Sequence, residues 1–147
     1  VRPFTYSQKE SVINYGHNYE ALAHPYGANF REYIGIVNYR YKRWNFNFKI
    51  NIIDGGAESI DSISVGTDIF KSYLDRENNE GYKIGYGERY VQTIIDSKLS
   101  YILNYNYLLN LQLGFVNRSF NLSNNVWNEQ LFYFGLKSSL FNSYYDY

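Results

Sequence analysis

The 147-residue chain is long enough for one domain with a core, and its 14 basic and 14 acidic residues cancel, so no nucleic-acid-binding surface is expected. It contains no cysteine, which excludes a disulfide framework or a thiolate-held metal. No apolar run reaches the roughly 18 residues of a transmembrane helix. Aromatic residues make up 20% of the chain, including 18 tyrosines, a bias that favours β-strands or an interface.

Several segments alternate apolar and polar residues with a period of two, which predicts β-strands. The clearest is WNFNFKINII, where aromatic or aliphatic residues take the even positions and Asn or Lys takes the odd positions up to Asn51. No convincing helix is expected. In chain order the expected strands are Arg31–Tyr41, Trp44–Ile53, Arg89–Leu103, Leu109–Phe115 and Glu129–Phe141, and Arg2–Ser7 could be the end of a sixth.

The expected connections alternate in length along the chain. Tight turns are expected at about 41–44 and 104–107, and longer loops at about 8–28, 54–88 and 119–128. Transmembrane β-barrels have short periplasmic turns and longer extracellular loops, whereas a soluble sandwich has no reason to keep its long loops on one side. The pattern therefore predicts that the two turns are periplasmic and the three loops extracellular.

The apolar positions of these strands carry no charge, as a surface in contact with lipid requires. Tyrosine and tryptophan gather at the two tight turns and at the C-terminus, and these residues favour the membrane interface. The expected lipid-facing residues are Phe46, Phe48, Ile50, Ile52, Leu109, Leu111, Leu113, Phe132 and Phe134. The expected aromatic girdle consists of Tyr39, Tyr41, Trp44, Tyr101, Tyr105, Tyr107, Tyr145 and Tyr147.

The opposite strand faces carry the charges. Both signs occur there, so these side chains could line a channel or bind a polyanionic glycan, or they could pair with one another in a filled interior. Asp96 and Lys98 are two residues apart on one strand face and can pair locally. The expected lumen-facing polar residues are Glu32, Arg40, Lys49, Asp96, Lys98 and Lys137.

The expected fold is all-β, with residues 1–147 forming one partial domain of about six C-terminal antiparallel strands from a larger transmembrane outer-membrane β-barrel. Six strands are fewer than the roughly eight of small single-chain barrels, and an open sheet would leave two bare edges in lipid. Strands preceding Val1, or several chains sharing one barrel, would close it. The alternative is a soluble antiparallel sheet with one buried face, which alternates in the same way.

The most distinctive local sequence is NYGHNYEALAHPYGANF. His17, Glu20 and His24 could meet as a ligand site on an extracellular loop, although their spacing matches no metal motif, and neither a metal nor a cofactor is expected. The alternative is an ordered loop that folds back into the barrel mouth, with Pro25 and Gly27 as its turn residues. The loop tyrosines that could stack on sugars, or only pack the loops, are Tyr19, Tyr26, Tyr73 and Tyr82.

Two further stretches are distinctive as wholes: RPFTYSQKESVINYGHNYEALAHPYGANFRE (Arg2–Glu32) and the final FGLKSSLFNSYYDY (Phe134–Tyr147). Both resemble segments of a Bacteroidota outer-membrane β-barrel family of the gliding-motility and capsule-assembly (Wzi-like) type. Gln8 stands where that family has His, and Glu20–Ala21 replaces a Gln-Pro-like pair. The closing FGLKSSLFNSYYDY (Phe134–Tyr147) is similar to the family's final segment and also ends on an aromatic residue. The residues shared in the first stretch are Thr5–Ser7, Asn14–His17, Leu22–Pro25 and Gly27–Phe30.

The resemblance implies an integral outer-membrane protein and no catalytic mechanism. We therefore expect a non-enzymatic protein linked to gliding motility, capsule or surface-polysaccharide handling, or a secretion-type surface complex. Its expected partners are outer-membrane lipid, other outer-membrane or surface proteins, and polysaccharide. The alternatives are a diffusion or uptake channel and a soluble ligand-binding β-barrel whose Tyr-rich face is its core. No Ser-His-Asp order or paired-carboxylate signature supports an enzyme.

Overall fold

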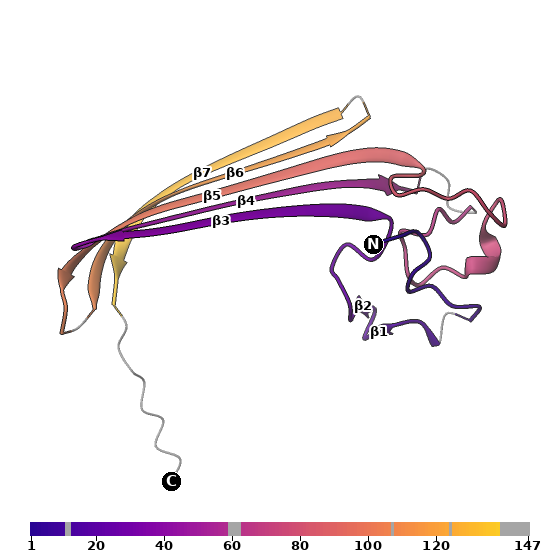
Figure 1. The fold of residues 1–147 in the computed structure, drawn as a ribbon, viewed down its shortest axis with the longest axis horizontal. Coiled ribbons are helices and arrows are strands. Elements are labelled where there is room, and N and C mark those ends of the chain that lie inside the picture. Colours follow the sequence, from indigo (N-terminus) through magenta and orange to yellow (C-terminus); the bar gives the residue numbers. More distant parts are fainter. Residues whose placement is uncertain (11–12, 59–62, 107, 124, 139–147) are drawn as a thin grey trace, which may run out of the picture. The chain divides into compact units, whose positions relative to one another are not determined.

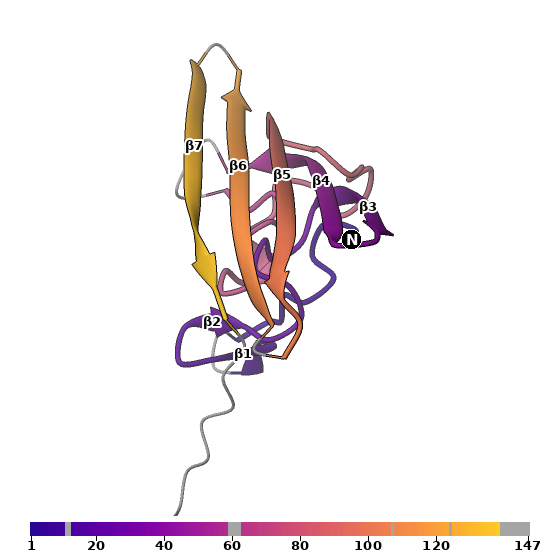
Figure 2. The ribbon, with the colours of Figure 1, turned by 90° about the vertical axis from the view of Figure 1, so that its left-hand side faces the viewer.

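The computed structural model describes residues 1–10, 13–58, 63–106, 108–123 and 125–138. The described chain is all-β and forms two antiparallel sheets. The smaller sheet pairs β1 (Gly16–His17) with β2 (Glu20–Ala21). The larger sheet is open and holds five strands side by side in chain order (Figures 1 and 2): β3 (Phe30–Tyr41), β4 (Trp44–Ala57), β5 (Glu88–Asn104), β6 (Leu109–Leu122) and β7 (Asn125–Lys137).

A short 3-10 helix, η2 (Tyr73–Asp75), lies in the connection between β4 and β5. The Ser72 side chain caps it by accepting a hydrogen bond from the backbone N–H of Leu74 at 3.2 Å. Within the described ranges, no helix is both long enough and apolar enough to cross a membrane.

The five main predicted strands are confirmed, with shifted ends. β4 continues past Ile53 to Ala57, and β6 continues past Phe115 to Leu122. β7 begins at Asn125, four residues before the predicted start at Glu129. These extensions contain Gly, Asn and Ser, which are typical of turns, but the backbone hydrogen bonds of a sheet form whatever the side chains are.

The predicted sixth strand at Arg2–Ser7 is wrong. Residues 3–6 form turns and bends, and Phe4 has a φ of 60°, which extended strands do not adopt. The N–H of Phe4 donates to the carbonyl of Gly66 at 3.1 Å, so this segment is tied to a loop and not to a sheet.

The predicted long loop at 119–128 is also wrong. β6 ends at Leu122 and β7 begins at Asn125, so most of the predicted loop is strand. Ser123 has a φ of 49°, and its hydroxyl donates to Glu88 Oε1 at 2.8 Å. The run of Asn and Ser residues resembles a loop in sequence, but its backbone pairs as strand.

The chain divides into two compact units. Unit 1 comprises Val1–Tyr33, Ile52–Gln92 and Ser119–Trp127, and unit 2 comprises Ile34–Asn51, Thr93–Arg118 and Asn128–Tyr147. That residues 1–147 form one partial domain stays a prediction. Unit 1 holds the core cluster of Phe30, Ile53 and Tyr90, against which Tyr26, Ala57, Phe120 and Leu122 pack.

Unit 2 is organised differently, because its described residues are almost entirely strand. Ile102 is the one buried apolar side chain among its described residues. Each predicted tight turn falls between two consecutive strands: Lys42, at φ 51°, lies between β3 and β4, and Leu108, at φ 47°, lies between β5 and β6. The N–H of Ile102 donates to the carbonyl of Arg43 at 2.9 Å. This bond places the β3–β4 turn beside the end of β5.

Candidate functional site

One face of the sheet in unit 2 is built from aromatic and aliphatic side chains. The rings of Trp44 and Tyr101 have their centroids 4.8 Å apart, and those of Phe115 and Phe132 are 4.5 Å apart. Leu99, Leu111 and Leu113 line a groove with the first ring pair. By strand alternation this surface, here called the apolar face, also carries Val37, Tyr39, Tyr41, Phe46, Phe48, Ile50, Ile95, Leu103, Leu109, Phe134 and Leu136.

The apolar face carries no charged residue and is not covered by a second layer in the described part of unit 2. Phe132 is 73% exposed and Phe134 is 82% exposed. Of the predicted lipid-facing residues, Ile52 falls in unit 1 and the others fall in unit 2 on this face. Contiguous exposed apolar surface of this extent normally marks a lipid or protein interface.

The predicted girdle is partly described. Tyr39 and Tyr41 are exposed near the first turn, and Arg43 lies 5.4 Å from the ring centroid of Tyr105. The Trp44–Tyr101 contact places two further members beside each other. Tyr107, Tyr145 and Tyr147 lie outside the described residues.

The opposite face of unit 2, here called the polar face, holds amide and charged side chains together with the exposed Ile34, Ile36 and Leu131. Asn47 donates to Asn38 across β3 and β4, and Lys98 Nζ lies 2.8 Å from Asp96 Oδ2. The predicted local pairing of Asp96 with Lys98 is therefore confirmed. By alternation Arg40, Lys49 and Lys137 occupy this same face.

The structure does not bring His17, Glu20 and His24 together. His17 and Glu20 are exposed partners in the β1–β2 hairpin. His24 instead contacts Glu32, a predicted lumen-facing residue on β3, at 3.1 Å between Nε2 and Oε2. Among the residues that the structure describes, no group of three or more His, Cys, Asp or Glu side chains could hold a metal ion.

His24 anchors an ordered loop that folds onto β3, and the barrel mouth of the alternative interpretation stays a prediction. The N–H of Tyr26 donates to His24 Nδ1 at 3.3 Å, which leaves the proton on Nε2 to be donated to Glu32. The imidazole packs against the Phe30 ring with centroids 4.6 Å apart. Gly27, at φ +66°, closes the turn by donating its N–H to the His24 carbonyl at 2.9 Å.

Asn29 holds the end of this loop in place. Its side chain is 0% exposed, and Nδ2 lies 3.2 Å from Gly56 O, 3.1 Å from Thr67 Oγ1 and 2.8 Å from Tyr86 O. Its Oδ1 accepts from the N–H of Gly85 at 2.8 Å. One amide therefore ties together the loop, the end of β4 and the β4–β5 connection.

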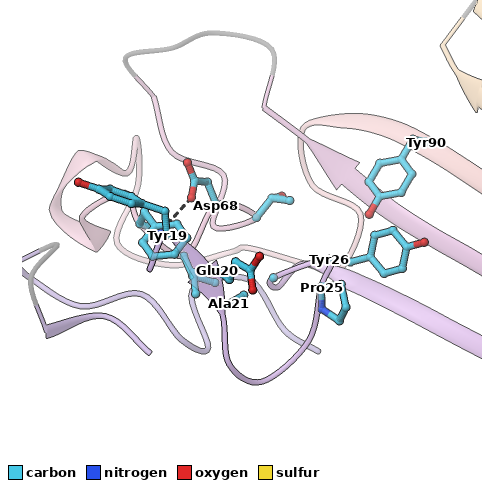
Figure 3. Close-up of a pocket in the computed structure, with 11 residues that line it drawn as sticks. Tyr19, Glu20, Ala21, Pro25, Tyr26, Asp68 and Tyr90 are labelled. Carbon is cyan, nitrogen blue, oxygen red and sulfur yellow. Dashed lines mark hydrogen bonds between the residues drawn. The ribbon is translucent and has the colours of Figure 1, made fainter. Parts of the chain in front are cut away.

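A cleft of about 690 Å³ lies in unit 1 between the 19–27 segment and the β4–β5 connection. Tyr19 lies at one end of it, and Tyr26 and Tyr90 lie at the other (Figure 3). Its lining contains two carboxylates and no lysine or arginine. The lining residues are Tyr19, Glu20, Ala21, Pro25, Tyr26, Gly27, Thr67, Asp68, Ile69, Phe70 and Tyr90.

Sequence reasoning identified only part of this cleft. Tyr19, Glu20 and Tyr26 were candidates for ligand contacts, but Asp68 and Phe70 were not. No sequence pattern marks the 67–70 segment, because its place in the cleft depends on hydrogen bonds made by residues far apart in the chain. One such bond joins the N–H of Ala28 to the Thr67 carbonyl at 3.2 Å.

Comparison with protein-family models, with curated proteins and with solved structures finds no match to the chain.

Proposed function

We propose that this chain forms part of a transmembrane outer-membrane β-barrel, in which the apolar face contacts lipid and the polar face lines the lumen. The observation that supports this most is the apolar face itself. It extends over all five strands of the larger sheet, it carries no charge, and within the described part of unit 2 nothing covers it. A soluble sheet needs a second layer on its apolar side.

The apolar stretch of β4 has the length that a bilayer requires. Same-face positions are apolar from Trp44 to Ile52 and then change to Asp54, which forms a salt bridge with Arg89 at 2.8 Å. The stretch Trp44–Ile52 is nine residues long, and a tilted β-strand crosses a bilayer with about 9–11 residues.

The two edges of the sheet favour a closed barrel with additional strands. β3 and β7 are the edge strands of the larger sheet. In lipid, an unpaired edge leaves backbone N–H and C=O groups without hydrogen bonds, and each such group costs several kcal/mol. Further strands, from a longer chain or from other copies, would satisfy both edges.

The cellular role we propose is non-enzymatic work at the cell surface, in gliding motility, capsule or polysaccharide handling, or a secretion-type complex. Its support is the resemblance of the Arg2–Glu32 and Phe134–Tyr147 stretches to the Wzi-like family. The expected partners are outer-membrane lipid, surface proteins and polysaccharide.

Adjacent cysteine substitutions test the lipid contact. The chain has no cysteine, so Phe134→Cys and Tyr133→Cys each provide one labelling site. We expect a bimane label at position 134 to be quenched by nitroxide on lipid acyl chains, because Phe134 lies on the apolar face. The same label at position 133 should be quenched weakly, since Tyr133 contacts Gln112 on the opposite face.

The measurement is bimane fluorescence of the full chain in vesicles with and without nitroxide lipid. Equal quenching at both positions would contradict the proposed faces. Release of the unlabelled protein from membranes by carbonate, without detergent, would contradict membrane insertion altogether.

A further inference from the structure

Tyr19 occupies a backbone position that tyrosine rarely adopts. β1 and β2 pair His17 with Glu20, so Asn18 and Tyr19 form a two-residue turn with φ values of 49° and 62°. Asn tolerates this left-handed conformation, but in a bulky residue it is strained, and hairpin turns of this kind favour Asn-Gly. Glycine or asparagine at position 19 would give a more stable turn.

The strain at Tyr19 is not offset by burial. Its side chain is 93% exposed, and its nearest ring neighbour is Phe70, at 6.4 Å between centroids. Backbone strain that brings no packing gain is characteristic of functional positions. The hairpin holds a bare aromatic ring at one end of the cleft (Figure 3).

The chemistry of the cleft selects the class of ligand. Aromatic rings offer flat apolar surfaces that stack on the C–H face of a sugar ring. The Glu20 and Asp68 carboxylates offer acceptors for hydroxyl groups, and Asp68 Oδ1 also accepts from the N–H of Phe70 at 2.9 Å. Two carboxylates without a lysine or arginine in the lining would repel a polyanion.

The spacing of the rings distinguishes a sugar chain from a small cation. A quaternary ammonium group needs aromatic rings that converge on one point. Here Tyr19 lies at one end of the cleft and Tyr26 and Tyr90 lie at the other, so the rings can serve successive units of an extended ligand (Figure 3).

We propose that this cleft binds a neutral oligosaccharide and that Tyr19 is the stacking residue at its mouth. This inference rests on the polysaccharide-handling role proposed above and names its ligand class and its site, and every residue involved belongs to unit 1. Its failure and the failure of membrane insertion are measured separately.

The test is binding of cello-, malto-, manno- and laminari-oligosaccharides to the full chain, measured by saturation-transfer-difference NMR and titration calorimetry. We expect at least one of these neutral probes to bind, and Tyr19→Ala to weaken that binding about tenfold or more. Tyr19→Trp, which keeps a flat ring, should retain it. Tyr19→Asn should lose binding without lowering the melting temperature, because Asn relieves the turn.

Tyr15→Ala is the matched control, since Tyr15 is an exposed tyrosine of the same segment that does not line the cleft. It should leave the affinity unchanged. The inference is overturned if no neutral probe binds, if Tyr19→Ala binds as tightly as the unaltered chain, or if Tyr15→Ala loses affinity equally. Tyr19-dependent binding of alginate oligosaccharide or of choline in place of the neutral probes would also overturn it.

Discussion

Replacing Asn29 by alanine is expected to destabilise the loop region of unit 1 by about 3 kcal/mol. The amide of Asn29 is fully buried, and its loss leaves the carbonyls of Gly56 and Tyr86 and the N–H of Gly85 without that partner. A buried polar group that loses its hydrogen bond costs about 1–3 kcal/mol, and alanine also tolerates the φ of 62° less well than asparagine.

Native-state hydrogen exchange measures this effect locally. Protection of the Ala28 amide, which donates to the Thr67 carbonyl, should fall a little over a hundredfold, the equivalent of about 3 kcal/mol. Asn18→Ala is the matched control, because Asn18 is also left-handed, at φ 49°, but its side chain is exposed. If both substitutions cost the same, backbone conformation and not the hydrogen-bond network is what matters at Asn29.

The strands of the larger sheet were predictable because apolar and polar residues alternate clearly along most of their length, as in Trp44–Ile53. Prediction failed where Asn and Ser residues, which are typical of turns, obscure the alternation. The segment from Ser119 to Asn128 is rich in Asn and Ser, yet the ladder pairs it as the ends of β6 and β7. The prediction for Arg2–Ser7 failed for the opposite reason. The short aromatic alternation of this segment resembles a strand, but Phe4 has a left-handed backbone conformation and donates its N–H to the Gly66 carbonyl.

The candidate site was less predictable than the strands. Sequence reasoning singled out His17, Glu20 and His24 as residue types that bind ligands, but it could not show that His24 is already engaged by Glu32. The cleft joins Tyr19 to Phe70, about fifty positions later in the chain. The segments of Tyr19 and Phe70 lie close together because of tertiary hydrogen bonds such as those of Asn29, and no local sequence pattern predicts these bonds.

Leu113→Arg provides the sharpest test of the proposed membrane face. Leu113 lies on the apolar face, in a groove with Trp44, Leu99, Tyr101 and Leu111. If this groove meets hydrocarbon, arginine there should lower the free energy of unfolding in lipid vesicles by about 2–4 kcal/mol, the cost measured for basic residues on the lipid face near the bilayer midplane. Urea titration of the vesicle-inserted protein measures that difference.

Gln112→Arg separates the effect of the face from the effect of the charge. Gln112 is the neighbouring residue on β6, and its amide contacts the Tyr133 hydroxyl at 3.4 Å on the polar face. A lumen-facing arginine keeps access to water or to other polar side chains, so this variant should lose about 1 kcal/mol or less. If the two variants lose equal stability, or if Leu113→Arg is well tolerated, the apolar face does not contact lipid. A soluble sheet with both faces hydrated would give that result, because an exposed leucine replaced by arginine changes stability little.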